Sequence, residues 1–213
     1  SSDLRMFFEV TEEGLPLRKR RYVFSECFAA IAMSEYALAS GDRTYAEKAL
    51  DLFKRILRNL ATPGLLEPKY LPTLQARGHS ITMILINTAS RIRAAISDPI
   101  LDTQINESIA AIRRYFMHPE FKALLEMVGL DGELIDTCNG RVINPGHCIE
   151  TAWFILEEAK HRHWDKDLVQ MGIRILEWSW EWGWDKEYGG IINFRDCRNF
   201  PVQDYSQDMK FWC

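Results

Sequence analysis

A histidine and a glutamate lie one helical turn apart in the otherwise apolar segment INPGHCIETAWF, residues 143–154. Asn144 is a favourable N-cap and Pro145 suits the first helical position, so a helix is predicted to begin here. His147 and Glu150 would then share a face, where the carboxylate can fix the orientation and tautomer of the imidazole. The helix N-terminus also disfavours a protonated ring. The sequence predicts either a catalytic base with its supporting carboxylate, or a structural pair that secures the start of a helix.

Other residue pairs that could do chemistry are weaker candidates. Cys148 follows His147 directly, but adjacent helical positions face apart, which argues against a Cys–His nucleophile. His161 and His163 are two residues apart near a predicted helix end, a poor spacing for metal ligands. The sequence contains neither a glycine-rich phosphate loop nor a G-x-S-x-G motif. No metal site is predicted.

Composition narrows the class of protein. The chain has 213 residues, 47% of them hydrophobic, with a net charge of −4 and a pI near 5.8, which argues against a dedicated nucleic-acid binder. The basic run at residues 18–21 is interpreted as a solvated strand face or a contact for phosphate or carboxylate.

No signal peptide appears, and the apolar run at 81–89 is too short to cross a bilayer. Five cysteines lack any C-x-x-C spacing, which predicts a reduced, cytoplasmic protein: Cys27, Cys138, Cys148, Cys197 and Cys213.

Hydrophobic periodicity and capping residues predict six helices. They cover residues 24–40, 42–60, 78–96, 99–116, 144–163 and 165–182. Extended segments separate the helix pairs. Residues 6–10 and 15–23 are predicted to form one hairpin, and 122–128 with 133–135 a second, turned at an Asp-Gly. Residues 189–194 begin a third, and the chain is expected to enter a seventh helix near residue 210.

Charged residues alternate between the predicted helices. The first helix contains only Glu26 and Glu35, whereas the second carries eight charges, and residues 146–156 of the fifth hold only Glu150. Odd helices are therefore predicted to be buried and even helices to be amphipathic covers. This pattern fits an all-α fold, an α/α toroid of which residues 1–213 supply three helix pairs of a single domain. Three pairs do not close a ring, so a piece of a longer protein is expected.

Inner helices that run parallel bring their N-termini to one mouth, where an anion or a developing negative charge is favoured. Glycoside hydrolases are one class of enzyme built on toroids of helix pairs, and in them two carboxylates flank the scissile bond. Glu26 with Glu150 is a candidate pair for that chemistry. A non-catalytic sugar-binding toroid is a further alternative. The polar residues that begin the odd helices are Ser25, Glu26, His79, Ser80, His147 and Glu150.

Four segments resemble the N-acylglucosamine 2-epimerase family. They are FSECFAAIAMSEY at 24–36, INPGHCIETAWF at 143–154, WDKEYGG at 184–190 and DMKFW at 208–212. The resemblance covers nearly the whole chain and implies an (α/α)6 barrel of which this chain is the middle part. One departure is Cys213, where family members usually have tryptophan.

The resemblance implies that His147 and Glu150 are catalytic and that the reaction inverts C2 of an open-chain aldose through an enediolate. It implies a second histidine base beyond Cys213 and a sugar-binding arginine in a preceding segment. His79 lies where relatives that act on cellobiose have a histidine. The residues expected to contact the sugar are Glu26, His79, Trp184, Lys210 and Trp212.

We therefore expect an isomerase that interconverts N-acetylglucosamine and N-acetylmannosamine, or a related aldose. An aldose–ketose isomerase or a cellobiose-type 2-epimerase of the same family remains an alternative, because both reactions pass through an enediol. No cofactor is expected to be required, although the resemblance allows a nucleotide such as ATP as an activator that is not consumed. The expected partner is a small sugar, with neither nucleic acid nor membrane, and a homodimer is the candidate assembly.

Overall fold

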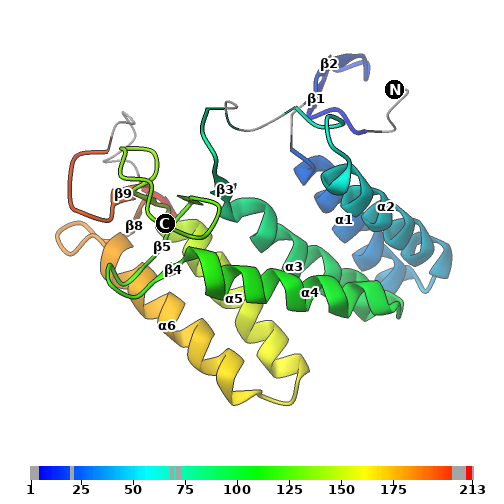
Figure 1. The fold of residues 1–213 in the computed structure, drawn as a ribbon. Coiled ribbons are helices and arrows are strands. Elements are labelled where there is room, and N and C mark those ends of the chain that lie inside the picture. Colours follow the sequence, from blue (N-terminus) through cyan, green and yellow to red (C-terminus); the bar gives the residue numbers. More distant parts are fainter. Residues whose placement is uncertain (1–4, 20–21, 68–69, 71–72, 203–209, 213) are drawn as a thin grey trace. The chain divides into compact units, whose positions relative to one another are not determined.

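The computed structural model describes residues 5–19, 22–67, 70, 73–202 and 210–212, the last three by their backbone alone. Within these residues the chain is mostly helical (Figure 1). The predicted helices are confirmed, with boundaries within about three residues of those expected. The fourth ends in a π-helical turn, η1, at Ile112–Phe116. The α-helices are α1 (Phe24–Ser40), α2 (Arg43–Ala61), α3 (His79–Ala95), α4 (Pro99–Ala111), α5 (Pro145–His161) and α6 (Lys166–Gly183).

The chain divides into two compact units. The first comprises Ser1–Leu74 and Asn87–Ile105, and the second comprises Gln75–Ile86 and Asn106–Cys213. The division falls within α3 and α4, so each of these helices contributes one part to each unit. The residues at the start of α3 therefore belong to the same unit as α5 and α6.

In the first unit, α1 and α2 form a helical hairpin. Gly41 ends α1 in the left-handed conformation (φ 75°) with its N–H on the Ala37 carbonyl, and Asp42 caps α2 by accepting from the Thr44 N–H. Helix α2 has an apolar stripe that packs inward, in which Ala46, Ala49, Leu50, Phe53 and Ile56 are buried. The predicted first hairpin is confirmed as strand β1 (Glu9–Val10) paired antiparallel with strand β2 (Pro16–Arg18).

In the second unit, α5 and α6 pack along each other (Figure 1, α6 in orange). Glycines permit the close approach, because a Cβ added at Gly183 would lie 2.5 Å from the Pro145 Cβ, and one at Gly172 would lie 2.6 Å from the Leu156 Cγ. The C-terminal end of α6 is thereby held against the first turn of α5. The face of α6 that packs inward repeats at helical spacing, with Leu168, Met171, Gly172, Ile175, Ser179 and Gly183 buried.

Short antiparallel strand pairs complete the second unit around these helix ends. Each pair joins segments far apart in sequence, except for β4 and β5. The pairs are β3 (Arg77–Gly78) with β6 (Met127–Val128), β4 (Met117–His118) with β5 (Ala123–Leu124), β7 (Val142–Ile143) with β9 (Arg195–Asp196), and β8 (Ile191–Ile192) with β10 (Lys210–Trp212).

Two predictions about extended segments are wrong. Residues 122–128 do not form a hairpin with 133–135. Their strands pair instead with β4 and β3, while 129–133 closes a tight turn through the Gly129 N–H on the Glu133 carbonyl. Residues 210–212 form strand β10 on β8 rather than the start of a helix. The partners of β6 and β10 lie elsewhere in the sequence, where local patterns do not report them.

The predicted contrast between odd and even helices is confirmed in part. Helices α2 and α6 are amphipathic covers as expected, and α5 is buried around most of its first three turns. Helix α1 buries one stripe but exposes Phe28, Tyr36 and Leu38. In the described residues, no helix combines the length and apolar character needed to cross a membrane.

Candidate active site

The segment that joins β5 to β6 is the support on which the candidate site is built. The Glu126 N–H donates to the Val142 carbonyl (3.1 Å), and the Glu126 carbonyl accepts from the His79 N–H (3.0 Å). Val142 lies in β7, two residues before the N-cap of α5, and His79 is the first residue of α3. Glu126 is therefore fixed by its backbone between the starts of the third and fifth helices.

The side chain of Glu126 holds the imidazole of His147. The Glu126 Oε1 lies 2.9 Å from the His147 Nδ1. Glu126 is largely buried, with 17% of its side chain exposed, whereas His147 keeps 33% exposed. A carboxylate accepts hydrogen bonds only, so the bond places a proton on Nδ1 and leaves the basic lone pair on Nε2. This is an oriented imidazole that can accept a proton from a ligand.

The start of α5 positions His147 as the sequence predicts. Asn144 is the N-cap, and its side-chain oxygen accepts from the His147 N–H at 3.1 Å. Pro145 occupies the first helical position and packs closely against Gly183 of α6. The imidazole is thus attached to a rigid first turn, and its ring orientation is set by Glu126.

The electrostatics of the site keep Glu126 ionised. Burial alone would raise the pKa of the Glu126 carboxyl, but the hydrogen bond from His147 and the nearby His79 ring hold it well below its ordinary value of 4.5. A negative charge facing His147 also stabilises the imidazolium that forms when the ring takes a proton. The pair is therefore suited to accept and release a proton.

Glu150 lies near this pair in a different environment. The hydrogen bond to His147 Nδ1 that we expected from Glu150 is made by Glu126. Glu150 is part-buried, and its pKa is raised, first by burial and also by the Glu126 charge, against an opposing effect of His147. Two carboxyl groups beside one imidazole thus have pKa values shifted in opposite directions, an arrangement that separates proton-donating from charge-stabilising roles.

His79 lies behind the pair rather than at a surface. Its side chain is buried, its Nε2 lies 3.1 Å from the Thr151 Oγ1, and its Nδ1 lies 3.6 Å from the Glu126 Oε1. The expectation that His79 contacts the sugar directly has no support in this buried position. The structure does bring the starts of α3 and α5 together through Glu126, as the predicted arrangement of parallel inner helices requires.

Glu26 belongs to the first unit, where it is buried at the start of α1. Its Oε1 accepts from the Met6 N–H at 2.8 Å and lies 3.7 Å from the Arg5 Nε. These contacts secure the segment that leads into the N-terminal hairpin. They give Glu26 a structural role in this unit, and its sugar contact stays a prediction.

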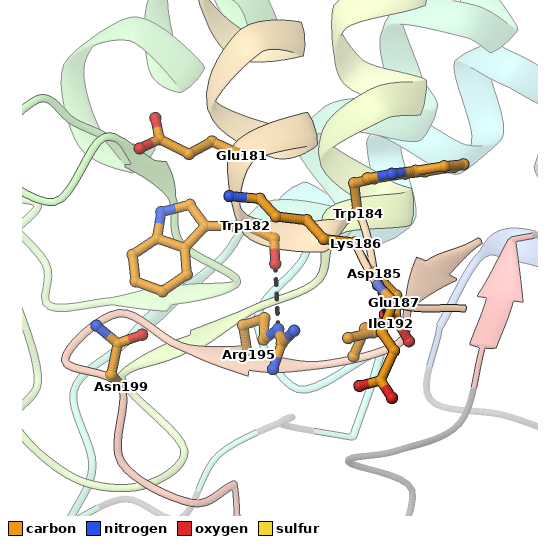
Figure 2. Close-up of a pocket in the computed structure, with 9 residues that line it drawn as sticks. All are labelled: Glu181, Trp182, Trp184, Asp185, Lys186, Glu187, Ile192, Arg195 and Asn199. Carbon is orange, nitrogen blue, oxygen red and sulfur yellow. Dashed lines mark hydrogen bonds between the residues drawn. The ribbon is translucent and has the colours of Figure 1, made fainter. Parts of the chain in front are cut away.

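Trp184 lines a pocket of about 740 Å³ in the second unit. Its indole stacks on that of Trp180, with ring centroids 4.9 Å apart. Figure 2 shows the Lys186 side chain between the indoles of Trp182 and Trp184, with Arg195 donating to the Trp182 carbonyl. Carbohydrates stack on exposed aromatic rings of this kind, so the position suits the sugar contact predicted for Trp184.

Two further predicted contacts lie beyond what the structure describes. Lys210 and Trp212 belong to strand β10, whose backbone pairs with β8, but their side chains are outside the described residues, as is Cys213. Cys148 is buried with its Sγ on the Leu124 carbonyl, and burial raises the pKa of its thiol well above the ordinary value. This agrees with the argument against a Cys–His nucleophile. Within the described part of the chain, no three His, Cys, Asp or Glu side chains are grouped to hold a metal ion.

Glu126 was not among the residues predicted for the site. It lies 21 residues before His147, a separation that no helical or strand periodicity connects. One signal was available, because Glu126 is the single charged residue in ALLEMV, residues 123–128. A lone charge in a run that is otherwise apolar requires a partner when the run is buried.

The helix pairs and the oriented imidazole at an inner helix start define a protein of the α/α-toroid class with an acid–base site. Residues 3–213 match the N-acylglucosamine 2-epimerase (GlcNAc 2-epimerase) family, and the chain belongs to this family of sugar epimerases and isomerases.

Individual relatives agree with this assignment. N-acylglucosamine 2-epimerase of Homo sapiens is 30% identical over 215 residues, covering 96% of this chain and 49% of the relative. The Bos taurus enzyme of the same name is 29% identical over 210 residues, with the same coverage. The structure of cellobiose 2-epimerase from Bacillus thermoamylovorans matches with a TM-score of 0.75 at 17% identity, covering 90% of this chain and 53% of that one.

These likenesses place the fold as a part of an (α/α)6 toroid. The chain spans about half the length of the curated relatives that it matches. The assignment of chemistry to the chain therefore depends on the site itself.

Proposed function

We propose that this chain carries the proton-abstracting half of a sugar 2-epimerase that interconverts N-acetylglucosamine and N-acetylmannosamine. The observation that supports the proposal most directly is the 2.9 Å hydrogen bond between the Glu126 carboxylate and the His147 Nδ1. It leaves the lone pair on Nε2 of a ring that is one-third exposed. Family membership and the two mammalian relatives support the substrate class.

In this scheme the Nε2 of His147 removes the proton on C2 of the open-chain sugar. The electron pair of the broken C–H bond moves into the adjacent carbonyl and gives an enediolate, while His147 becomes an imidazolium stabilised by Glu126. Return of a proton to the other face of C2 gives the epimer. We expect the second proton donor from the half of the relatives' length that this chain does not span.

Glu150 is proposed to act on the oxygen side of the enediolate. Burial raises the pKa of its carboxyl, which makes the group a better proton acceptor and suits it to exchange a proton with the oxygen on which negative charge develops. The change Glu150→Gln keeps a donor of the same size but removes the proton that can be transferred. It is expected to lower kcat by about 10²-fold with an unchanged circular dichroism spectrum. Full activity in this variant would return Glu150 to a structural role.

The proposal is tested by analysing the products formed from N-acetylmannosamine by a protein of full family length, which joins this chain to the half expected to supply the second proton donor. We expect N-acetylglucosamine to appear, and His147→Asn to abolish conversion, because the amide retains polarity but cannot accept the proton. No nucleotide or other cofactor is consumed in this scheme, although a nucleotide may be added as an activator in the assay.

Other products would indicate the alternatives. A ketose from a free hexose would identify an aldose–ketose isomerase, which shares the enediol. An epimer formed only from cellobiose would identify a disaccharide 2-epimerase. A monosaccharide released from a glycoside would identify a hydrolase, and binding with no product from any of these sugars would indicate a non-catalytic toroid. The last two results would contradict the proposal.

A further inference from the structure

His79 combines burial with two polar contacts that the proposed reaction does not use. Its side chain is 1% exposed and its ring lies edge-on to that of Phe116, with centroids 5.5 Å apart. The Nε2 lies 3.1 Å from the Thr151 Oγ1, and the Nδ1 lies 3.6 Å from the Glu126 Oε1. The same Glu126 oxygen is bonded to the His147 Nδ1.

The hydroxyl of Thr151 restricts where His79 carries its proton. Thr151 has one hydroxyl hydrogen, and its oxygen lies 2.8 Å from the His147 carbonyl, which can only accept. If Thr151 donates to that carbonyl, the His79 Nε2 must donate to Thr151. If Thr151 instead donates to the His79 Nε2, the neutral ring carries its proton on Nδ1, but the Thr151 and His147 oxygens then lie 2.8 Å apart with no hydrogen between them.

The first case still leaves the state of Nδ1 to decide. An unprotonated Nδ1 would direct its lone pair at an ionised carboxylate oxygen 3.6 Å away in the protein interior, which is a repulsive contact. A protonated Nδ1 makes the contact attractive. The arrangements that turn an N–H toward Glu126 therefore have a proton on Nδ1, either in the neutral ring or in the imidazolium, and the imidazolium also lets Thr151 donate to the His147 carbonyl.

We propose that His79 is a positioning residue that presents an Nδ1–H to Glu126, so that this carboxylate is held between two imidazole N–H groups. The proposal rests on the proposed function for its effect on turnover, but not for the protonation itself. His79 also holds the segment through its backbone N–H on the Glu126 carbonyl. A Glu126 fixed from both sides keeps the His147 proton on Nδ1 and the basic lone pair on Nε2.

Several titratable groups of α3 and α5 interact with the Glu126 carboxylate. His79 approaches Glu126 from α3 and His147 from α5, and the Glu126 charge in turn acts on Cys148 and Glu150 of α5. Loss of the His79 proton would make Glu126 a stronger acceptor for His147 and would favour the imidazolium. The acid limb of the kcat/KM profile, which reports the loss of a neutral base, would then move to higher pH.

The protonation is tested directly by two-bond ¹H–¹⁵N correlation spectra of the ¹⁵N-labelled protein. The chain has five histidines, and the His79 signals are assigned as those that are lost in His79→Gln and in His79→Asn. We expect a protonated Nδ1 at pH 7, in either the neutral Nδ1–H form or the cation. A neutral His79 ring with its proton on Nε2 alone would overturn the proposal, whether or not the protein is active.

The effect on turnover is tested with a matched pair of amide variants. The amide nitrogen of His79→Asn falls near the original Nδ1, whereas that of His79→Gln falls near the original Nε2. We expect the Asn variant to retain kcat within about threefold and the Gln variant to lose about 10-fold, the lower end of the range for lost supporting partners. KM should change little in either, because His79 is buried.

The pH profile separates positioning from packing. The acid limb should move to higher pH in the Gln variant and stay in place in the Asn variant. Equal kcat losses with an unmoved acid limb in both variants would show a packing role and overturn the positioning role. Absence of epimerisation in the unaltered protein would instead count against the proposed function, and the spectra would still decide the state of His79.

Discussion

Glu126 is the residue on which the account of the site depends most. It is bonded through its backbone to the starts of two helices and through its side chain to His147. His118 and Glu120 form a pair with the same atoms at the same 2.9 Å, but Glu120 is 58% exposed. The difference in burial makes the second pair a matched control for the first, because solvent screens an exposed pair.

The acid dependence of stability should reveal the buried carboxylate. The folded-state pKa of Glu126 lies well below 4.5, so Glu126 stabilises the fold above that pH, and this contribution is lost as the pH falls toward the folded-state pKa. We expect Glu126→Gln to be less stable than the unaltered protein at pH 7, with the difference narrowing below about pH 4.5. Urea unfolding at a series of pH values measures this. Glu120→Gln should change stability much less, and a Glu126→Gln difference independent of pH would contradict the assignment of charge.

His147 was predictable from the sequence, whereas its partner Glu126 was not. His147 was recognisable because its helix start is written locally, in an N-cap, a proline and a histidine three residues after the cap. Glu126 was not, because its position depends on the pairing of β3 with β6 and on the Glu126 N–H contact with Val142. The assignment of the supporting role to Glu150 followed from helical spacing alone, which cannot detect a competing carboxylate from another segment.

Among the elements, helix starts connect stability to function. Asn144 caps α5 by accepting from the His147 N–H, and Asp165 caps α6 by accepting from the Asp167 and Leu168 N–H groups. Both caps perform the same local task. Only the first holds the turn that carries the candidate base.

The two caps should therefore separate stability from activity. Asn144→Ala and Asp165→Ala are each expected to lower the free energy of unfolding by about 0.5–2 kcal/mol. At a temperature well below the melting temperature, where both variants are folded, Asn144→Ala should also lower kcat/KM, whereas Asp165→Ala should not. Equal effects of both variants on kcat/KM would show that the α5 cap serves stability alone.

Helices were predictable because their signals are local, and the strands were not. The stripe of α2, the Gly41 C-cap and the Asp42 N-cap all lie within a few residues of the structure they specify. Strands of two residues have no periodicity to detect, and Arg77 pairs with Val128 across 51 positions of sequence. The hairpin predicted at 122–135 was wrong because the Asp-Gly turn was assumed to join the two nearest extended segments.

For the whole molecule, the comparisons and the surface agree that the chain accounts for part of a toroid. It covers about half of each curated relative. Helix α1, predicted to be an inner helix, exposes Phe28, Tyr36 and Leu38. Its buried stripe and its charge-poor sequence are consistent with the inner position. That residues 1–213 do not form a closed domain on their own stays a prediction, and a stable, compact monomer measured by light scattering would contradict it.

The central claim is that His147 exchanges a proton with C2 of a sugar, and isotope incorporation tests it most directly. A histidine that has taken a proton can exchange it with water before the next turnover. A protein of full family length that contains this chain, incubated in D2O with N-acetylmannosamine, should therefore form N-acetylglucosamine that carries deuterium at C2, detected by NMR as loss of the C2 proton signal. His147→Asn should form neither product nor label. Epimer without deuterium at C2, formed equally well by His147→Asn, would contradict the account.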